Sequence, residues 1–257
     1  MPSILYEVRD GVGIITLNRP DKLNAVNREM ALLLKEKLNA CAADKQVRCI
    51  YITGAGKAFC AGQDLTEVDP DNEDTNLILR EQYNPLVWKI RTIEKPVVGA
   101  VNGLAAGAGA NLAFCCDVVI ATESAYFTQA FSKIGLIPDT GGTYILPRFV
   151  GWQKASGMMM LGDKIGAIEG EKMGMLYKVF PDAVFEEETF KIAKQLANMP
   201  TKSLAMIKHA LNFSAIYSFK EQLDVEDEFQ KIALHSHDYK EGVKAFLEKR
   251  APEFKGE

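Results

Sequence analysis

Apolar residues recur along the chain with two different spacings. Short apolar runs bounded by turn residues, which are typical of strands, occupy the first two thirds of the chain. The strands predicted in this way are residues 4–9, 12–17, 49–53, 97–101, 117–121 and 178–180. Asp10-Gly11, between the first two runs, is a hairpin turn signal. From Glu186 onward the apolar spacing is wholly helical, so the pattern predicts a helical C-terminal region.

Helical spacing also separates most of the predicted strands. The helices expected there are residues 27–43, 77–93, a helix from about 107, one reaching 150, and residues 151–161 and 167–173. Residues 57–66 are predicted to form a loop, and residues 125–135 short strands or irregular structure. This alternation indicates an α/β protein, with a core over residues 1–195 and a helical region over 196–257. The apolar faces of that region suit packing on another subunit or on the protein's own core.

The stretch from Lys95 to Phe114 is predicted to be the functional centre. A buried strand leads into a turn in which glycines and alanines leave almost no side chain at the start of a helix near Gly107. A helix N-terminus has unpaired N–H donors and a partial positive charge, so it favours an oxygen that is becoming negative. We therefore predict half of an oxyanion hole, with close helix packing as the alternative. The main chain is bared a second time at Ala61-Gly62.

Two nucleotide-binding interpretations of the glycines are weak. The dinucleotide fingerprint needs a third glycine three residues after Gly109, and that position is Leu112. A phosphate-binding P-loop needs serine or threonine after Gly56-Lys57, and the next residue is Ala58.

Composition and charge exclude several classes of protein. The 257 residues are 47% hydrophobic and 25% charged, which is ordinary for a soluble globular protein. A formal charge of −4 disfavours a broad nucleic-acid-binding surface. No apolar run reaches the roughly 18 residues that a membrane span needs, and the first residues show no signal-peptide pattern. We expect a cytoplasmic protein that acts on neither membranes nor nucleic acids.

Cysteine and histidine do not indicate a metal site. The five cysteines are odd in number and show no CxxC spacing, so they are expected to be small core residues in a reducing compartment. His209, His235 and His237 all lie near the C-terminus, far from the glycine-rich stretch. Neither a zinc site nor a histidine-based nucleophile is predicted.

Three segments together carry a resemblance to a known family. Residues 57–65 (KAFCAGQDL), 102–109 (NGLAAGAG) and 137–143 (IPDTGGT) resemble, in wording, order and spacing, the crotonase (enoyl-CoA hydratase/isomerase) superfamily. The resemblance extends from Val12 to Phe254. It implies a spiral of ββα units with a C-terminal helical trimerisation region, and a homotrimer or a dimer of trimers. It also implies an acyl-CoA thioester as substrate and no cofactor, because CoA is part of the substrate.

The resemblance also implies the site residues. The main-chain N–H groups of Gln63 and Ala108 would hold the thioester oxygen. Two segments would contact CoA, the first containing Lys22, Leu23 and Ala25 and the second Ala61, Asp64 and Leu65. Three aromatic residues, Tyr83, Phe131 and Tyr144, would line the acyl pocket, although isolated aromatic residues are more often core.

The base is predicted from where the chain departs from the family pattern. Family hydratases carry two glutamates at the positions that are Asn111 and Phe131 here, so a water held between two carboxylates is disfavoured. Asp139 stands where several family isomerases have aspartate, and the resemblance implies that it is the base. Its alternative role is the N-cap of the helix after Gly141-Gly142. Flanking Phe131, Ile137 and Tyr144 would desolvate the carboxylate partly and raise its pKa.

Several functions stay open at this stage. Residues 83–87, 130–139 and 238–243 resemble the family members that convert ring-1,2-epoxyphenylacetyl-CoA to oxepin-CoA in phenylacetate catabolism. A Δ3,Δ2-enoyl-CoA isomerase or a hydratase-like enzyme of fatty-acid β-oxidation is the first alternative. Asp139 could instead attack carbon, as in the family's aryl-CoA dehalogenases. The non-enzymatic alternative is a catalytically silent acyl-CoA-binding protein.

The acidic segment 66–75 is predicted to be a mobile loop. Asp21, Glu67, Asp69 and the acidic residues of 71–74 are interpreted as solvated charges in loops.

Overall fold

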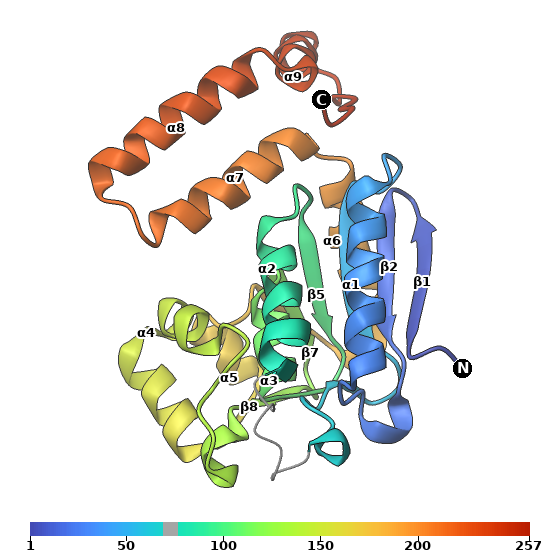
Figure 1. Ribbon diagram of the computed structural model, residues 1–257. Coiled ribbons are helices and arrows are strands. Elements are labelled where there is room, and N and C mark those ends of the chain that lie inside the picture. The colour runs from blue at the N-terminus through green and yellow to red at the C-terminus, as the bar shows by residue number, and fades with distance from the viewer. Residues whose placement is uncertain (69–76) are drawn as a thin grey trace.

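The computed structural model describes residues 1–68 and 77–257 (Figure 1). Strands and helices alternate through the first part of the chain, and helices follow from residue 185 to residue 248. The prediction of an α/β protein with a helical C-terminal region is confirmed. Most of the acidic segment 66–75, with Asp69 and residues 71–74, lies outside the described residues.

In the described part of the chain, the larger layer is a six-stranded sheet. Its strands, in spatial order, are β1 (Ile4–Arg9), β2 (Val12–Leu17), β3 (Cys49–Gly54), β5 (Val97–Val101), β7 (Val118–Thr122) and β10 (Lys178–Phe180). β1 and β2 form the predicted antiparallel hairpin, in which Asp10 and Gly11 have φ angles of 51° and 76°. The other neighbours are parallel and have helices on both faces. Burial on both faces explains why these strands are continuous apolar runs.

A second sheet consists of the short strands that follow the long ones. These strands are β4 (Ala58–Cys60), β6 (Leu104–Ala106), β8 (Tyr126–Thr128) and β9 (Lys164–Gly166). β4 follows β3, β6 follows β5 and β8 follows β7, and each pair leads into a helical segment, as in the predicted spiral of ββα units. The prediction that residues 57–66 are only a loop is wrong. Pairing with β6 makes residues 58–60 a strand, and three residues are too few to show a periodicity.

Helices cover the sheets on both sides. The core helices are α1 (Arg28–Ala43), α2 (Asn84–Thr92), α3 (Ala108–Phe114), α4 (Gly142–Leu161), α5 (Ala167–Lys172) and α6 (Phe185–Ala197). Short 3-10 helices are η1 (Pro20–Lys22), η2 (Leu65–Glu67), η5 (Ala130–Ile134) and η6 (Asp182–Val184). α1 to α3 pack on one face of the large sheet, and α6 packs on the other.

Two helices depart from the predicted boundaries. The helix expected at 77–93 starts as a π-helix, η4 (Ile78–Tyr83), and continues as α2. The helices expected on either side of residue 150 are merged into α4, with a kink at Gly151, whose φ is 76°.

Glu67 is exposed, as predicted, and it also holds the start of α1. Asn27 caps this helix by accepting a hydrogen bond from the main-chain nitrogen of Met30 at 3.0 Å. Glu67 Oε2 accepts a second bond of 2.8 Å from the main-chain nitrogen of Arg28. Glu67 therefore caps α1 from the neighbouring loop.

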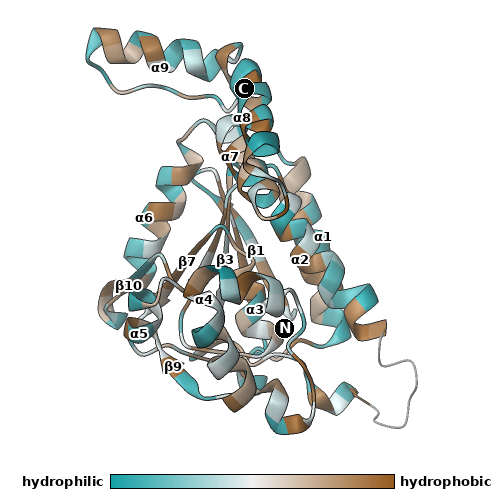
Figure 2. Cartoon of the chain, turned by 90° about the vertical axis from the view of Figure 1, so that its left-hand side faces the viewer, coloured by the Kyte–Doolittle hydropathy of each residue, from teal (hydrophilic) through white to brown (hydrophobic). Residues whose placement is uncertain are grey.

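Three helices extend beyond the core at the C-terminal end (Figure 1): α7 (Thr201–Ser214), α8 (Phe219–Leu234) and α9 (His237–Glu248). α7 is tied to the core by the buried Lys208, which pairs with Asp117 at 2.8 Å. Figure 2 shows hydrophobic residues distributed along these helices, and many of their large apolar side chains are exposed in the single chain: Ile207, Leu211, Phe219, Leu223, Phe246 and Leu247. The division of the chain at residue 195 stays a prediction.

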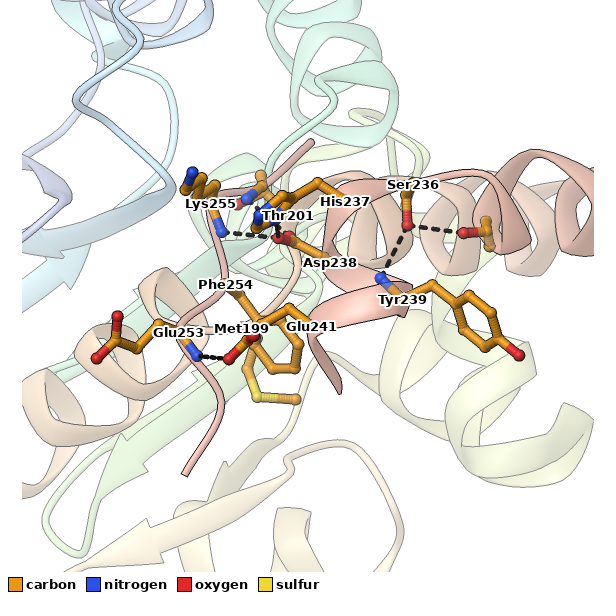
Figure 3. A network of polar contacts seen from close by, with 12 residues as sticks. Met199, Thr201, Ser236, His237, Asp238, Tyr239, Glu241, Glu253, Phe254 and Lys255 are labelled. Atoms are coloured by element: carbon orange, nitrogen blue, oxygen red, sulfur yellow. Dashed lines mark hydrogen bonds and ion pairs between the residues drawn. The ribbon is translucent and has the colours of Figure 1, made fainter. Parts of the chain in front are cut away.

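The C-terminal segment folds back onto α9 (Figure 3). The buried carboxylate of Asp238 accepts hydrogen bonds of 2.7 Å from the main-chain nitrogens of Lys255 and Gly256. Arg48, from the core, donates to the main-chain oxygen of Phe254 at 2.7 Å and to Thr201 Oγ1 at 3.0 Å. The last residues therefore connect α9, α7 and the core. None of the described helices has both the length and the apolar composition to cross a bilayer.

Candidate active site

The first candidate oxyanion donor stands at the start of α3. Gly107 precedes the helix with φ 52° and ψ −124°, and its nitrogen donates to the main-chain oxygen of Thr128 at 2.9 Å. Such positive φ angles favour glycine. A side chain here would also place its Cβ 3.5 Å from the ring of Phe131. Ala108 is then the first helical residue, and its N–H has no acceptor among the described residues.

The second candidate donor follows β4. The oxygen of Gly62 accepts from Val26 N at 2.7 Å, and the nitrogen of Asp64 donates to Val26 O at 2.9 Å. These two bonds hold the main chain on either side of Gln63, whose own N–H has no acceptor among the described residues. A Cβ at Gly62 would lie 3.6 Å from Ala108 N, so the two bared segments meet. The structure thus brings together the two donor segments that the sequence predicts.

Close packing, the alternative explanation of the small residues, also holds. A Cβ added to Gly109 would lie 2.4 Å from the main-chain oxygen of Cys60. α3 can approach β4 so closely only with glycine at this position. The small residues therefore allow close packing and also expose the main-chain N–H groups. The exposure depends on the packing, because only the close approach of α3 and β4 brings the two segments together.

The two predicted CoA-contacting segments lie side by side. The nitrogen of Ala61 donates to the oxygen of Leu23 at 3.0 Å. The buried Asn24 supports this arrangement by donating from Nδ2 to the main-chain oxygens of Ala55 and Ala58, at 2.9 and 2.7 Å. Lys22 is exposed at the end of η1, so it remains available to a ligand.

Asp64 uses its carboxylate within the protein. The residue is only 6% exposed, and Oδ2 pairs with Arg19 Nη2 at 2.8 Å. Oδ1 accepts from Thr66 Oγ1 at 2.7 Å, and hydrogen bonds from Thr66 and Arg19 lower the pKa of the Asp64 carboxyl. A contact of this carboxylate with CoA therefore has to compete with two existing partners. Leu65 beside it is exposed.

Asp139 lies in the turn that leads into α4. The N-cap interpretation is wrong, because the cap position belongs to Gly141 and no side chain caps the helix. Asp139 Oδ1 instead accepts from Thr140 Oγ1 at 2.7 Å. Burial raises the pKa of the Asp139 carboxyl, and the hydrogen bond from Thr140 opposes part of that rise. A raised pKa makes the ionised form a stronger base.

The aromatic residues differ in how far they fit the predicted pocket. Phe131 is buried against Gly107, next to the start of α3. Tyr83 is 1% exposed, and its hydroxyl has no hydrogen-bond partner among the described residues. Burial raises the pKa of the Tyr83 phenol, with smaller contributions from Cys60, Asp139 and Asp64.

Two residues predicted to flank Asp139 do not enclose it in the single chain. Ile137 is 80% exposed. Tyr144 is 45% exposed and packs its ring under the guanidinium of Arg148, 3.7 Å from the ring centroid. The prediction that Ile137 desolvates the carboxylate is wrong for a single chain, because so exposed a side chain excludes little water.

Two buried amides, Asn111 and Gln129, have a role that was not predicted from the sequence. Asn111 Nδ2 donates to the main-chain oxygen of Asp139 at 2.8 Å, and Gln129 Nε2 donates to Asn111 Oδ1 at 2.7 Å. A polar residue in the middle of the apolar helix α3 is a signal that could have drawn attention to Asn111. Nothing in the local sequence marks Gln129, whose partner lies 18 residues away.

Comparison with known proteins identifies the family. A family model described as enoyl-CoA hydratase/isomerase matches residues 7–257. The chain belongs to this family, the crotonases. It is 46% identical to the 1,2-epoxyphenylacetyl-CoA isomerase of Escherichia coli K12, over 100% of this chain and 99% of that protein. It is 35% identical to the 2,3-dehydroadipyl-CoA hydratase of the same organism, with all of both chains covered.

Solved crotonase structures have the same fold. The enoyl-CoA hydratase of Bacillus anthracis superposes with a TM-score of 0.93 at 31% identity, covering 99% of this chain and 100% of that one. The resemblance found in the sequence is confirmed, and so is the crotonase fold. The protein is a crotonase-family enzyme that acts on CoA thioesters. Because its relatives include an isomerase and a hydratase, the family alone does not define the reaction.

Proposed function

We propose that this crotonase is a CoA-thioester isomerase in which Asp139 moves a proton and the amides of Gln63 and Ala108 stabilise the enolate. The single observation that carries the proposal is that the site combines two main-chain N–H donors with one carboxyl that suits a base. Among the described residues, two N–H groups without an acceptor meet at the start of α3, and Asp139 is the one carboxyl nearby whose pKa is raised.

The reaction needs only these groups. The ionised Asp139 removes a proton from a carbon of the acyl group, and the electron pair moves onto the thioester oxygen. Two fixed N–H donors stabilise this oxyanion, and losing one such donor typically costs about 3 kcal/mol. The protonated Asp139 then returns the proton to another carbon, so a double bond shifts and no atom is gained or lost. The reaction requires no cofactor, since CoA is part of the substrate.

The preferred substrate is ring-1,2-epoxyphenylacetyl-CoA, with oxepin-CoA as product. The support is the 46% identity to a relative with that activity and the aromatic residues Phe131 and Tyr83 near the site. Δ3,Δ2-Enoyl-CoA isomerisation is the second candidate, because the same base and oxyanion hole would perform it. Hydration is less favoured, since Asn111 is an amide engaged at both ends and supplies no second carboxylate.

The deciding experiment follows the α- and γ-protons of 3-hexenoyl-CoA by NMR in D₂O, with wild type and Asp139→Asn in parallel. Exchange and double-bond migration are expected in the wild type and should fall by about 10²- to 10⁴-fold in the variant, the usual contribution of a general base. Epoxyphenylacetyl-CoA is assayed in the same way. Near wild-type rates in Asp139→Asn would refute the mechanism. CoA-thioester binding without turnover of either substrate would support the silent binding protein instead, and a covalent adduct trapped on Asp139 would support nucleophilic attack.

We also propose a location, an oligomeric state and a range of partners for the enzyme. We expect a cytoplasmic homotrimer or dimer of trimers that binds no nucleic acid and no membrane. The exposed apolar side chains of α7 to α9 support self-association, because contiguous apolar surface of this kind usually marks a protein interface.

A further inference from the structure

A chain of buried amides connects the candidate base to the candidate oxyanion hole. Asn111 is the fourth residue of α3, one helical turn after Ala108, and is fully buried. Its main-chain nitrogen donates to the oxygen of Gly107 at 3.0 Å. Its side chain reaches in the other direction, to the main-chain oxygen of Asp139 at 2.8 Å. One residue of α3 thus connects to both parts of the site.

The turn that carries Asp139 is held tightly against Asn111. The oxygen of Asp139 accepts a second bond of 2.8 Å from the nitrogen of Gly142. A Cβ at Gly142 would lie only 2.3 Å from Asn111 Nδ2, so the approach of the two segments requires glycine there. Thr140, between these residues, has a φ of 54°, which is strained for a β-branched side chain. A strained turn keeps its shape only where its surroundings hold it.

Gln129 holds the other end of the Asn111 amide. The main-chain oxygen of Asp139 can only accept, so it faces Asn111 Nδ2, and Asn111 Oδ1 accepts from Gln129 Nε2 at 2.7 Å. The opposite orientation would place Asn111 Oδ1 against the oxygen of Asp139, two acceptors facing each other. Gln129 is 1% exposed and follows Thr128, whose oxygen accepts the bond from Gly107. β8 therefore holds both the turn before the oxyanion donor and the amide that holds the base.

We propose that Asn111 is a positioning residue that sets the place of the Asp139 carboxylate relative to the oxyanion hole, and that Gln129 holds Asn111 in place for this role. The proposal rests on the proposed function in one respect, namely that Asp139 is the base. Both amides are buried, so neither side chain is exposed to a ligand in the single chain. Their effect is on the distance between the carboxylate and the carbon that it deprotonates.

The test uses Asn111→Leu, which removes both bonds, and Gln129→Met, which keeps the Asn111 side chain but removes its second hydrogen-bond partner. Misplacing a catalytic group by about 1 Å typically lowers the rate about 100-fold. We expect kcat for 3-hexenoyl-CoA isomerisation to fall by about that factor, with KM changed by no more than about twofold because substrate binding is not altered. Tyr51→Phe is the matched control. It removes a buried hydrogen bond of 2.8 Å to Thr189, between β3 and α6, and should lower Tm without changing kcat.

A purely structural role predicts a different result. Asn111→Leu and Gln129→Met would then behave like Tyr51→Phe, with a lower Tm and an unchanged kcat, and that outcome overturns the proposal. If Asn111→Leu does not fold, the kcat of Gln129→Met decides the question. Asp139→Asn, measured alongside, distinguishes the hypothesis that Asp139 is the base from the hypothesis that Asn111 positions it. If it is inactive while the amide variants are fully active, only the positioning role fails, whereas an active Asp139→Asn refutes the base itself.

Discussion

Gly62 and Ala106 meet so closely that a Cβ at position 62 would lie 2.9 Å from the main-chain oxygen of Ala106. Gly62 also has a φ of 95°, which side chains rarely adopt. This contact between the loop after β4 and the end of β6 places Gln63 beside the start of α3. The geometry of the proposed oxyanion hole therefore depends on the absence of one side chain.

Gly62→Ala is expected to separate the two donors. An added methyl group must push the loop away from β6, and the loss of one oxyanion donor lowers kcat by about 10²- to 10³-fold. Steady-state kinetics with 3-hexenoyl-CoA measures the effect. Gly157→Ala is the control, because a Cβ at that position in α4 meets no atom within 4 Å. A wild-type kcat in Gly62→Ala would show that the two segments do not act together.

Asp139 should control the pH dependence of activity. The base must be ionised, so kcat/KM falls as the pH falls through the pKa of Asp139. Because burial raises this pKa, the decline should start at a higher pH than for an exposed aspartate. A pH profile of kcat/KM tests this, and a decline only in the ordinary range of aspartate would contradict it.

The raised pKa of Asp139 also predicts that ionising this carboxyl destabilises the fold, whereas ionising a carboxyl that is paired with a cation stabilises it. The folded chain holds the proton of Asp139 to a higher pH than the unfolded chain, so ionisation of Asp139 destabilises the fold as the pH rises. Asp139→Asn removes this cost. The variant should have a higher Tm than wild type at pH 7, and the difference should vanish below the unfolded pKa of aspartate. Thermal unfolding of both proteins across this pH range is the measurement. A lower Tm for the variant at pH 7 would contradict the prediction.

The Arg19–Asp64 pair should influence CoA binding more than chemistry. Arg19 pairs with Asp64 and also donates to the oxygen of Ala25 at 2.6 Å, so it connects the two predicted CoA-contacting segments. Asp64→Asn is expected to raise KM roughly tenfold, which corresponds to about 1.4 kcal/mol of binding, and to leave kcat nearly unchanged. Lys194→Gln, which removes an exposed pair with Asp10, is the control. A large fall in kcat at constant KM would place Asp64 in the chemistry instead.

The hydroxyl of Tyr83, which has no partner in the part of the chain that the structure describes, should matter to the substrate and not to the fold. A buried hydroxyl without a partner costs about 1 to 3 kcal/mol, so Tyr83→Phe should not lower Tm. If the hydroxyl donates to the epoxide oxygen, kcat/KM for epoxyphenylacetyl-CoA falls about tenfold in this variant, the equivalent of one hydrogen bond. 3-Hexenoyl-CoA, which lacks that oxygen, should be affected much less. A Tm lowered by several degrees would reveal a structural partner.

Self-association should depend on the exposed apolar side chains of the C-terminal helices. Phe246 is 82% exposed on α9, and Phe219 is exposed at the start of α8. Phe246→Asp combined with Phe219→Asp is expected to lower the molar mass in light scattering from trimer or hexamer toward monomer, since burying a charge without a partner is unfavourable. Lys240→Glu, an exposed change on α9, should leave the mass unchanged. A double variant with wild-type mass would place the interface elsewhere.

Most of the secondary structure could be predicted from the sequence, because it is governed by local patterns of apolar and turn residues. The hairpin at Asp10-Gly11, the strand 97–101 and the helix that begins after Gly107 all follow from the spacing of apolar residues and from turn residues. The exposed main chain at Gly62 and Gly107 could also be predicted, because glycine and alanine have no side chain or only a methyl group. The family resemblance rested on these same segments.

Contacts between distant segments were decided only by the tertiary structure. Residues 58–60 become a strand because residues 104–106 lie beside them, and Asp139 is not a cap because Gly141 occupies that position. The bond between Gln129 and Asn111 joins residues on different elements, so no local period encodes it. Sequence patterns record what each residue prefers with its neighbours in the chain. Which buried polar groups satisfy one another is determined only when the packed elements bring them within hydrogen-bonding distance.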